Sequence, residues 1–385
     1  MRNDVLFLTL KVFSSTGGIE KVCRIAGKAM YETCTRFNKR LKVFSMHDGQ
    51  KSAADNLYFP LEVFTGFHVN KIRFMRKAVR QGISSKIIII SHINLLLAGW
   101  IIKKINPSVK IVLFAHGIEV WPRAGAFKRR MLKCCDEIIC VSEYTRKKMI
   151  DVHGVSPAVC TILNNCLDPF LPLPRNVQPN EQLKKRYGFH DGDKILFTLS
   201  RLAATERYKG YDKVMEAMLD LNDKDVKYLI AGSYDAEEKR HIDELVKRFG
   251  LEGRVILAGF IPEEEVAQHF VMSHAYVMPS IKEGFGIVFI EAMYYGLPVI
   301  AGNADGSVDA LQNGKLGLLV NPHDVNEIKN AIEQVLEQRD NYLPDRKLLH
   351  DHFSYDAYKT KVHFLFNNLQ LWNEKKYGNS VSKDS

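Results

Sequence analysis

Residues 275–302, AYVMPSIKEGFGIVFIEAMYYGLPVIAG, decide how the rest of the chain is interpreted. The stretch opens with a short apolar run that a proline ends, which predicts a buried parallel strand. A loop with two glycines follows, and apolar residues then recur at helical spacing from Ile287 until Gly296 and a proline stop the pattern. The stretch therefore predicts a strand, a loop, a helix and a second strand.

Two carboxylates lie in this unit, Glu283 in the loop and Glu291 about two turns into the helix. Eight residues of helix span roughly 12 Å, so the pair suits two ends of one extended ligand better than a shared proton or a metal ion. A single acid is more often a surface residue, but Glu291 lies among apolar positions and Glu283 precedes Gly-Phe-Gly. Between the acids, the free backbone N–H groups of a helix N-terminus suit an anion. These groups belong to Gly284, Phe285, Gly286 and Ile287.

The pattern EGFGIVFIEAMYYGLPVIA, a Glu, seven residues and a second Glu, resembles the signature of the retaining glycosyltransferase family 4. The resemblance implies the GT-B fold, in which two Rossmann-like domains hold a nucleotide-sugar donor in the cleft between them. We therefore expect an α/β protein with two doubly wound domains facing across a cleft. A C-terminal helix is expected to cross back to the first domain.

Length and charge agree with two domains of different character. A chain of 385 residues is too long for one core. Its net charge of +10 is uneven, because residues 1–170 hold 27 Lys and Arg against 12 Asp and Glu, whereas the remainder is mildly acidic. A basic domain suits nucleic acid, an anionic membrane surface or an anionic substrate. No nucleic-acid-binding motif is present, so we expect no nucleic-acid partner.

Cysteine usage and hydropathy indicate a cytoplasmic protein. The seven cysteines form no C-x-x-C pair and are predicted to be free thiols. The apolar run near the N-terminus is too short for a secretory signal and follows Asp4. No apolar run approaches the ~20 residues that span a bilayer. We expect a cytoplasmic location, with peripheral contact at the inner face of the membrane as a further possibility.

Two features of the first half are candidate ligand contacts. Gly17 and Gly18 follow a predicted strand at 4–10 and precede a helix, so their backbone suits contact with a phosphate or sugar, although a tight connection explains them equally well. They are not part of a G-x-G-x-x-G fingerprint, which disfavours a dehydrogenase. His116 follows a buried strand at 109–115, where open α/β sheets bind ligands. The resemblance implies that the Gly pair meets the donor and that His116 meets the transferred sugar.

The second half repeats this arrangement. Arg201 and Lys209 flank a loop after a predicted strand at 194–200, and two cations there suit a diphosphate unless they are unrelated surface charges. The resemblance implies a pyrophosphate site at this pair, with a longer loop than most members have. Gly232 and Ile261 follow two further predicted strands. In the family, backbone groups at the position of Ile261 read the nucleobase.

Two basic, partly apolar segments lie in the first half, at 71–80 and 127–133. Solvated helix faces explain such segments about as well as a membrane surface does. Because two of them occur in one basic domain, we favour contact with anionic lipid or with a lipid-linked phosphate acceptor. The basic residues are Lys71, Arg73, Arg76, Lys77, Arg80, Lys128, Arg129 and Arg130.

A proline-dense stretch after residue 168 predicts the domain boundary. The predicted ranges are a first domain at 1–168, a linker at 169–182, a donor-binding domain at 183–352, a terminal helix at 353–374 and a tail at 375–385.

These residues and the resemblance predict a retaining, metal-independent transfer of a hexose from a UDP- or GDP-sugar to a glycan or lipid-linked acceptor. The expected context is the synthesis of lipopolysaccharide, capsule or exopolysaccharide, with no cofactor. A nucleotide-sugar epimerase of the same fold and a non-catalytic nucleotide-sugar binding protein remain alternatives. The predicted catalytic residues are His116, Glu283, Arg201 and Lys209. The predicted donor contacts add Gly17, Gly18, Gly232, Ile261, Gly284, Phe285, Gly286, Ile287 and Glu291.

Overall fold

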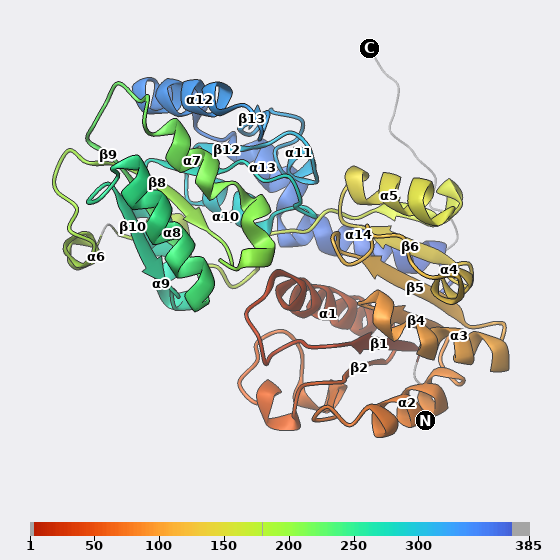
Figure 1. The fold of residues 1–385 in the computed structure, drawn as a ribbon. Coiled ribbons are helices and arrows are strands. Elements are labelled where there is room, and N and C mark those ends of the chain that lie inside the picture. The colour runs from red at the N-terminus through yellow and green to blue at the C-terminus, as the bar shows by residue number, and fades with distance from the viewer. Residues whose placement is uncertain (1–3, 179, 372–385) are drawn as a thin grey trace, which may run out of the picture.

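The computed structural model describes residues 4–178 and 180–371, which form two parallel β-sheets with packed helices (Figure 1). The first sheet has seven strands in the order β3-β2-β1-β4-β5-β6-β7. The second has six, in the order β10-β9-β8-β11-β12-β13. The predicted α/β class with two doubly wound domains is confirmed. The strands are β1 Val5–Thr9, β2 Leu41–Ser45, β3 Phe64–Gly66, β4 Ile87–Ile90, β5 Lys110–Ala115, β6 Glu137–Cys140, β7 Cys160–Ile162, β8 Lys194–Leu199, β9 Val226–Ala231, β10 Val255–Gly259, β11 Ala275–Met278, β12 Val299–Gly302 and β13 Leu318–Val320.

The central strands are mostly apolar because both faces of each sheet are covered. In β1, Val5 and Phe7 pack into one core cluster of the first domain, whereas Leu6 and Leu8 pack into another. Strands buried on both faces lose the alternation of polar and apolar residues. The chain order reverses beside β1 and beside β8. At such points the loops after the strands diverge and leave room for a ligand.

The helices begin and end where local chemistry dictates. For example, the Ser142 side chain accepts a hydrogen bond from the backbone N–H of Thr145 at the start of α5, and Gly154 ends this helix in the left-handed conformation. The helices are α1 Gly18–Arg36, α2 Lys71–Gly82, α3 Leu96–Ile105, α4 Ala126–Leu132, α5 Glu143–His153, α6 Glu181–Arg186, α7 Tyr211–Ala217, α8 Ala236–Phe249, α9 Glu263–Met272, α10 Ile287–Tyr294, α11 Ser307–Ala310, α12 Val325–Glu337, α13 Arg346–Phe353 and α14 Tyr355–Asn368.

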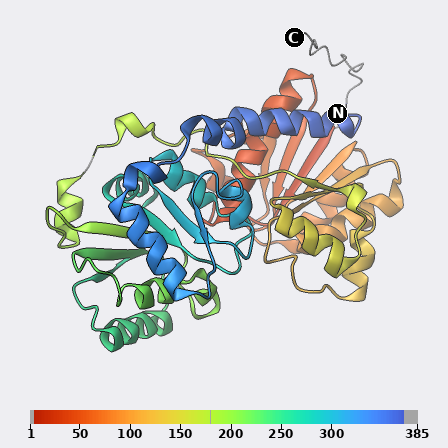
Figure 2. The same cartoon turned by 90° about the horizontal axis from the view of Figure 1, so that it is seen from above.

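The C-terminal helix returns to the first domain, as predicted. Tyr358, Val362 and Phe366 of α14 join the core cluster that contains α1, and Figure 2 shows α14 in blue along the first domain. The predicted helix at 353–374 corresponds to α14, which begins two residues later because α13 ends at Phe353 and the Ser354 side chain caps α14. The two places where the chain passes between domains also touch. The backbone N–H of Leu167 donates to the carbonyl of Phe353 at 2.9 Å.

The predicted ranges for the linker and the second domain cut through one element, since α6 spans Glu181–Arg186. The predicted tail at 375–385, the last three residues of the predicted terminal helix and residue 179 of the linker lie outside the described residues. Within residues 4–178 and 180–371, no helix has both the length and the apolar character that a membrane crossing requires.

Candidate functional site

The two domains touch through backbone at the ends of β5 and β11. A Cβ atom added to Gly284 would lie 2.1 Å from the carbonyl oxygen of His116 and 3.2 Å from the Cα of Gly117. Real Cβ atoms do not approach backbone so closely, so only glycine permits this contact. The Gly-Phe-Gly loop thus meets the backbone of the other domain, and the structure brings His116 and Glu283 to one interface.

His116 is a buried, neutral side chain at this interface. Its Nε2 lies 2.9 Å from the carbonyl oxygen of Ser91, and a carbonyl can only accept, so Nε2 carries the proton. Its Nδ1 is buried and has no hydrogen-bond partner among the described residues. Burial lowers the pKa of His116 from 6.5 to about 4. The ring therefore offers a free acceptor nitrogen and no positive charge at neutral pH.

Lys209 and Glu283 form a close ion pair in the second domain. The Lys209 Nζ lies 2.6 Å from Glu283 Oε2, and the side chains are 13% and 18% exposed. Burial alone would lower the pKa of Lys209, but the Glu283 carboxylate raises it above 10.5, so the lysine is charged. The loop before it is held in place, because Arg207 Nε donates to the buried Glu238 at 3.0 Å. The longer loop therefore does not keep Lys209 from Glu283.

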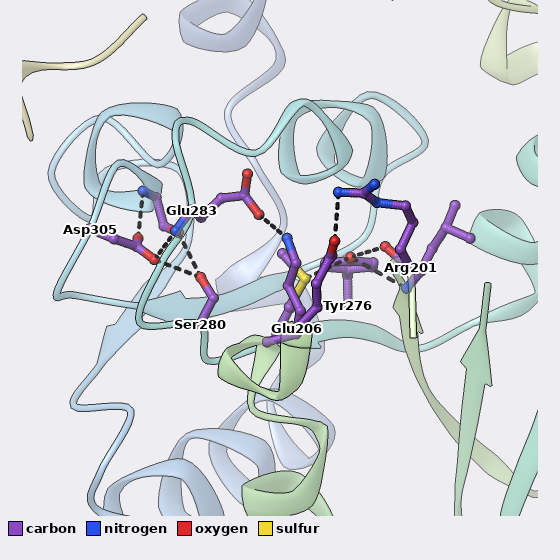
Figure 3. A network of polar contacts seen from close by, with 10 residues as sticks. Arg201, Glu206, Tyr276, Ser280, Glu283 and Asp305 are labelled. Atoms are coloured by element: carbon purple, nitrogen blue, oxygen red, sulfur yellow. Dashed lines mark hydrogen bonds and ion pairs between the residues drawn. The ribbon is translucent and has the colours of Figure 1, made fainter. Parts of the chain in front are cut away.

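Arg201 lies at the exposed side of the same loop. Its side chain is 76% exposed and pairs with Glu206 at 2.6 Å. Figure 3 shows this pair near Glu283 and above the strand that carries Tyr276. Both predicted cations are thus near one sheet edge, with Lys209 buried and Arg201 open to solvent.

Glu291 is buried, so the alternative interpretation of it as a solvent-exposed charge on the helix surface is excluded. It is 5% exposed, and its Oε1 accepts a hydrogen bond from Lys21 Nζ at 2.6 Å. Lys21 lies in the first turn of α1, in the other domain. Lys21 was not predicted from the sequence. The available signal was its position three residues after Gly18, on the helix that the Gly pair opens.

Asp305 was also missed, and it fixes the backbone of Glu283. Its Oδ2 accepts from the Glu283 N–H at 2.7 Å and from the Ser280 hydroxyl at 2.8 Å (Figure 3). The N–H of Gly306 donates to the Glu283 carbonyl at 2.8 Å. The peptide groups on both sides of Glu283 are therefore held. The sequence feature that could have identified Asp305 is an Asp-Gly pair just after a predicted strand.

The stability of the protein should depend on the ionisation of Asp305. Burial raises its pKa from 3.8 to about 6, so the folded state holds this proton more tightly than the unfolded chain. Protonated Asp305 therefore adds to the free energy of unfolding. This contribution, about 3 kcal/mol, is fully present below the pKa of the unfolded chain and is lost as the pH rises through about 6. Urea unfolding from pH 4 to 7 should show this fall in wild type relative to Asp305→Asn. A constant difference between the two proteins would contradict it.

Three predicted donor residues have clear structural surroundings. Gly232 has φ of +138°, and an added Cβ would lie 1.6 Å from the Ser200 carbonyl oxygen, so the chain's own backbone requires this glycine. The Phe285 ring is 1% exposed and packs edge-on against Phe353. Only the backbone of Phe285 can therefore reach a ligand, and the backbone N–H is the group that the prediction named. Ile261 is 6% exposed, so here too only the backbone can reach a ligand.

The two helix N-termini that were predicted to meet an anion both lack a side-chain cap. The helix α10 begins at Ile287 after Gly286, whose φ is +83°. The helix α1 begins at Gly18 after Gly17. The loop before Gly17 is shaped by the buried Asp48, which accepts from backbone N–H groups such as that of Val12 at 2.6 Å.

The basic segments lie elsewhere, on α2 and α4. Figure 1 places these helices on the part of the first domain that is remote from the second sheet. Ile72 and Phe127, which lie among the basic residues, are 74% and 56% exposed. The Lys128 side chain is engaged within the protein, since its Nζ donates a hydrogen bond to Asn94 Oδ1 at 2.9 Å. The structure therefore separates these residues from the domain interface. Among the residues that the structure describes, no group of three or more His, Cys, Asp and Glu side chains is placed to hold a metal ion.

Comparison with known proteins agrees with this geometry. Residues 26–169 match the model of Glycosyltransferase Family 4, and residues 179–359 match that of Glycosyl transferases group 1. A GDP-mannose-dependent α-(1-6)-phosphatidylinositol monomannoside mannosyltransferase of Mycolicibacterium smegmatis is 30% identical over 241 residues, which are 59% of this chain and 61% of the relative. The chain thus matches less than two thirds of that protein's length.

Two solved structures share the fold over nearly the whole chain. Anabaena HepE in complex with UDP is 19% identical, with a TM-score of 0.77 over 95% of this chain and 100% of the other. WaaG, a glycosyltransferase involved in lipopolysaccharide biosynthesis, is 16% identical, with a TM-score of 0.62 over 94% and 99%. The matches to the two family models follow one another along the sequence, and with the shared GT-B fold they show that the chain belongs to the family 4, group 1 glycosyltransferases.

Proposed function

We propose that this protein transfers a hexose from a UDP- or GDP-sugar to a glycan or lipid-linked acceptor, with retention of configuration and without a metal ion. One observation carries the proposal. The loop with His116 touches the loop with Glu283, and Lys209 lies against that same carboxylate. A sugar diphosphate between the domains would meet a cation, carboxylates and backbone dipoles at once.

The main chemical task is to stabilise the leaving diphosphate. Its developing negative charge is met most effectively by fixed cations and N–H dipoles. Lys209 is charged and largely buried, and its partner Glu283 lies shortly before the uncapped start of α10 in sequence. Arg201 adds a second cation at the solvent side. We assign Glu283 to the hexose hydroxyls and Glu291 to the ribose hydroxyls.

A transfer that retains the anomeric configuration is compatible with the groups around His116. In the proposed step the bond between the anomeric carbon and the phosphate oxygen breaks, and the acceptor hydroxyl bonds to that carbon on the same face. The departing phosphate takes the hydroxyl proton. The His116 carbonyl oxygen and free Nδ1 are electron-rich and suit the positive charge that develops on the sugar ring. Glu283 is engaged by Lys209, so we assign it to binding and not to covalent attack.

A lipid-linked acceptor would account for the basic helices. The mycobacterial relative is named for a phosphatidylinositol mannoside acceptor, and WaaG for lipopolysaccharide biosynthesis. The α2 residues Lys71, Arg73, Arg76, Lys77 and Arg80 are exposed with Ile72 among them. Such a mixture of basic and apolar side chains binds anionic lipid surfaces. We therefore place α2 and α4 at the inner face of the cytoplasmic membrane during synthesis of a surface glycan.

Thermal unfolding with a panel of UDP- and GDP-sugars tests the proposal. A ligand at one hundred times its Kd should stabilise the protein by about 2.7 kcal/mol, so a single nucleotide family should raise Tm clearly. Donor consumption with a glycan acceptor should then exceed consumption without it. An epimerase would convert the donor alone, and a binding protein would show stabilisation without turnover. If no member of the panel stabilises the protein, the proposal is wrong.

A further inference from the structure

Lys21 and Glu291 form a buried ion pair between the domains that the proposed chemistry leaves unexplained. The Nζ–Oε1 distance is 2.6 Å, and the side chains are 17% and 7% exposed. Glu263, on α9, is a second carboxylate 3.9 Å from the same ammonium, but it is 61% exposed. Breaking a buried ion pair costs more than breaking a surface one, because the charge left behind has no solvent. Lys21 therefore needs an anion whenever Glu291 is engaged elsewhere.

Donor binding would create this situation. In the proposed function, which this inference rests on, Glu291 binds the ribose hydroxyls of the nucleotide. Hydroxyl groups compete with the Lys21 ammonium for the carboxylate but carry no charge to replace it. The diphosphate is attached to the same ribose and supplies the missing anion. A lysine has a flexible four-carbon stem, so its ammonium can change partner without movement of the helix.

We infer that Lys21 is a donor-binding residue of the first domain, which pairs with Glu291 in the free protein and with the diphosphate in the complex. In this role Lys21 distinguishes a nucleoside diphosphate from a nucleoside. It also makes binding of the diphosphate depend on the presence of the first domain.

Binding of UDP and uridine, or of GDP and guanosine if the protein prefers that base, tests the inference by calorimetry. Lys21→Met should weaken binding of the diphosphate by about 10- to 100-fold, the usual effect of one hydrogen bond to a charged group. Binding of the nucleoside should be unchanged or tighter, because the competitor for Glu291 is gone. The readout is the ratio of the two affinities, from which a general loss of stability cancels.

Lys28→Met is the matched control. Lys28 lies on the same helix, is 19% exposed and pairs with Glu32 at 2.7 Å, but this carboxylate is on α1 itself. The control should leave the affinity ratio unchanged, and Lys21→Arg should largely restore it. If Lys21→Met does not fold, the double variant with Glu291→Gln removes the unpaired carboxylate, and its ratio of diphosphate to nucleoside affinity should be about 10- to 100-fold lower than that of Glu291→Gln alone.

The outcomes separate the inference from the proposed function. Equal losses for diphosphate and nucleoside, or no loss for either, would show that Lys21 is only a structural counter-ion. Wild-type protein that binds neither UDP nor GDP would instead overturn the proposed function, and the inference with it.

Discussion

Replacing Lys209 with methionine is expected to lower donor turnover by about 10²- to 10³-fold, the range seen when one fixed electrostatic contact to a transition state is removed. The ammonium lies 2.6 Å from Glu283 and is 13% exposed, so little water is available to replace it. The variant also leaves Glu283 without its counter-ion next to the proposed position of the sugar. The effect should therefore appear in kcat as well as in KM.

Steady-state release of UDP or GDP measures this effect. Lys213→Met is a matched control, because Lys213 lies on the next helix and pairs with Glu216 at 2.8 Å, three residues away. The control removes the same charge from the same region and should keep turnover within about twofold of wild type, since such surface pairs contribute little. Similar kinetics for the two variants would refute the role of Lys209.

The substitution Gly284→Ala should reduce turnover by about 100-fold, because an error near 1 Å in the position of reacting groups has this effect. The new methyl group would lie 2.1 Å from the His116 carbonyl oxygen, and neither backbone can yield without separating the loops. Gly284 has no positive φ in the structure, so alanine is acceptable to its own loop. The damage should be confined to the contact between domains.

Turnover and small-angle scattering together examine this prediction. The variant should keep the nucleotide contacts of Lys209 and Arg201 but lose the contact of Lys21, which requires the first domain close by, and its radius of gyration should increase. Gly125→Ala provides the control, since an added Cβ at Gly125 meets nothing within 4 Å. A compact, active Gly284→Ala protein would mean that the domains do not need this contact.

The sequence predicted most of the second sheet because its strands are continuous apolar runs that glycine or proline ends. The strand at 275–278 and the helix from Ile287 lie where the pattern placed them. The short edge strands β3 and β13 were not predicted, because three residues carry too little pattern. The start of the terminal helix was predicted two residues early, because Phe353 ends α13 and Ser354 caps α14 without interrupting the apolar spacing.

The candidate site was predicted less completely, for physical reasons. The residues that follow the strands could be named, since strand ends are visible in the sequence. The partner of Glu291 could not, because Lys21 is 270 residues away and reaches it only through the packing of two domains. For Phe285, the two flanking glycines indicated a close approach of backbone, and the buried ring leaves the backbone as the part that can contact a ligand. Whether the named residues bind a donor stays a prediction.

The hydrogen bond between Leu167 and Phe353 has a consequence for motion. The chain passes between the domains at these two places, and the 2.9 Å contact holds the two connections side by side. Covalent links at one point allow rotation about an axis through that point but little sliding. The two domains should therefore open by a hinge rotation about this point, so that atoms far from Leu167 move most and those beside it move least.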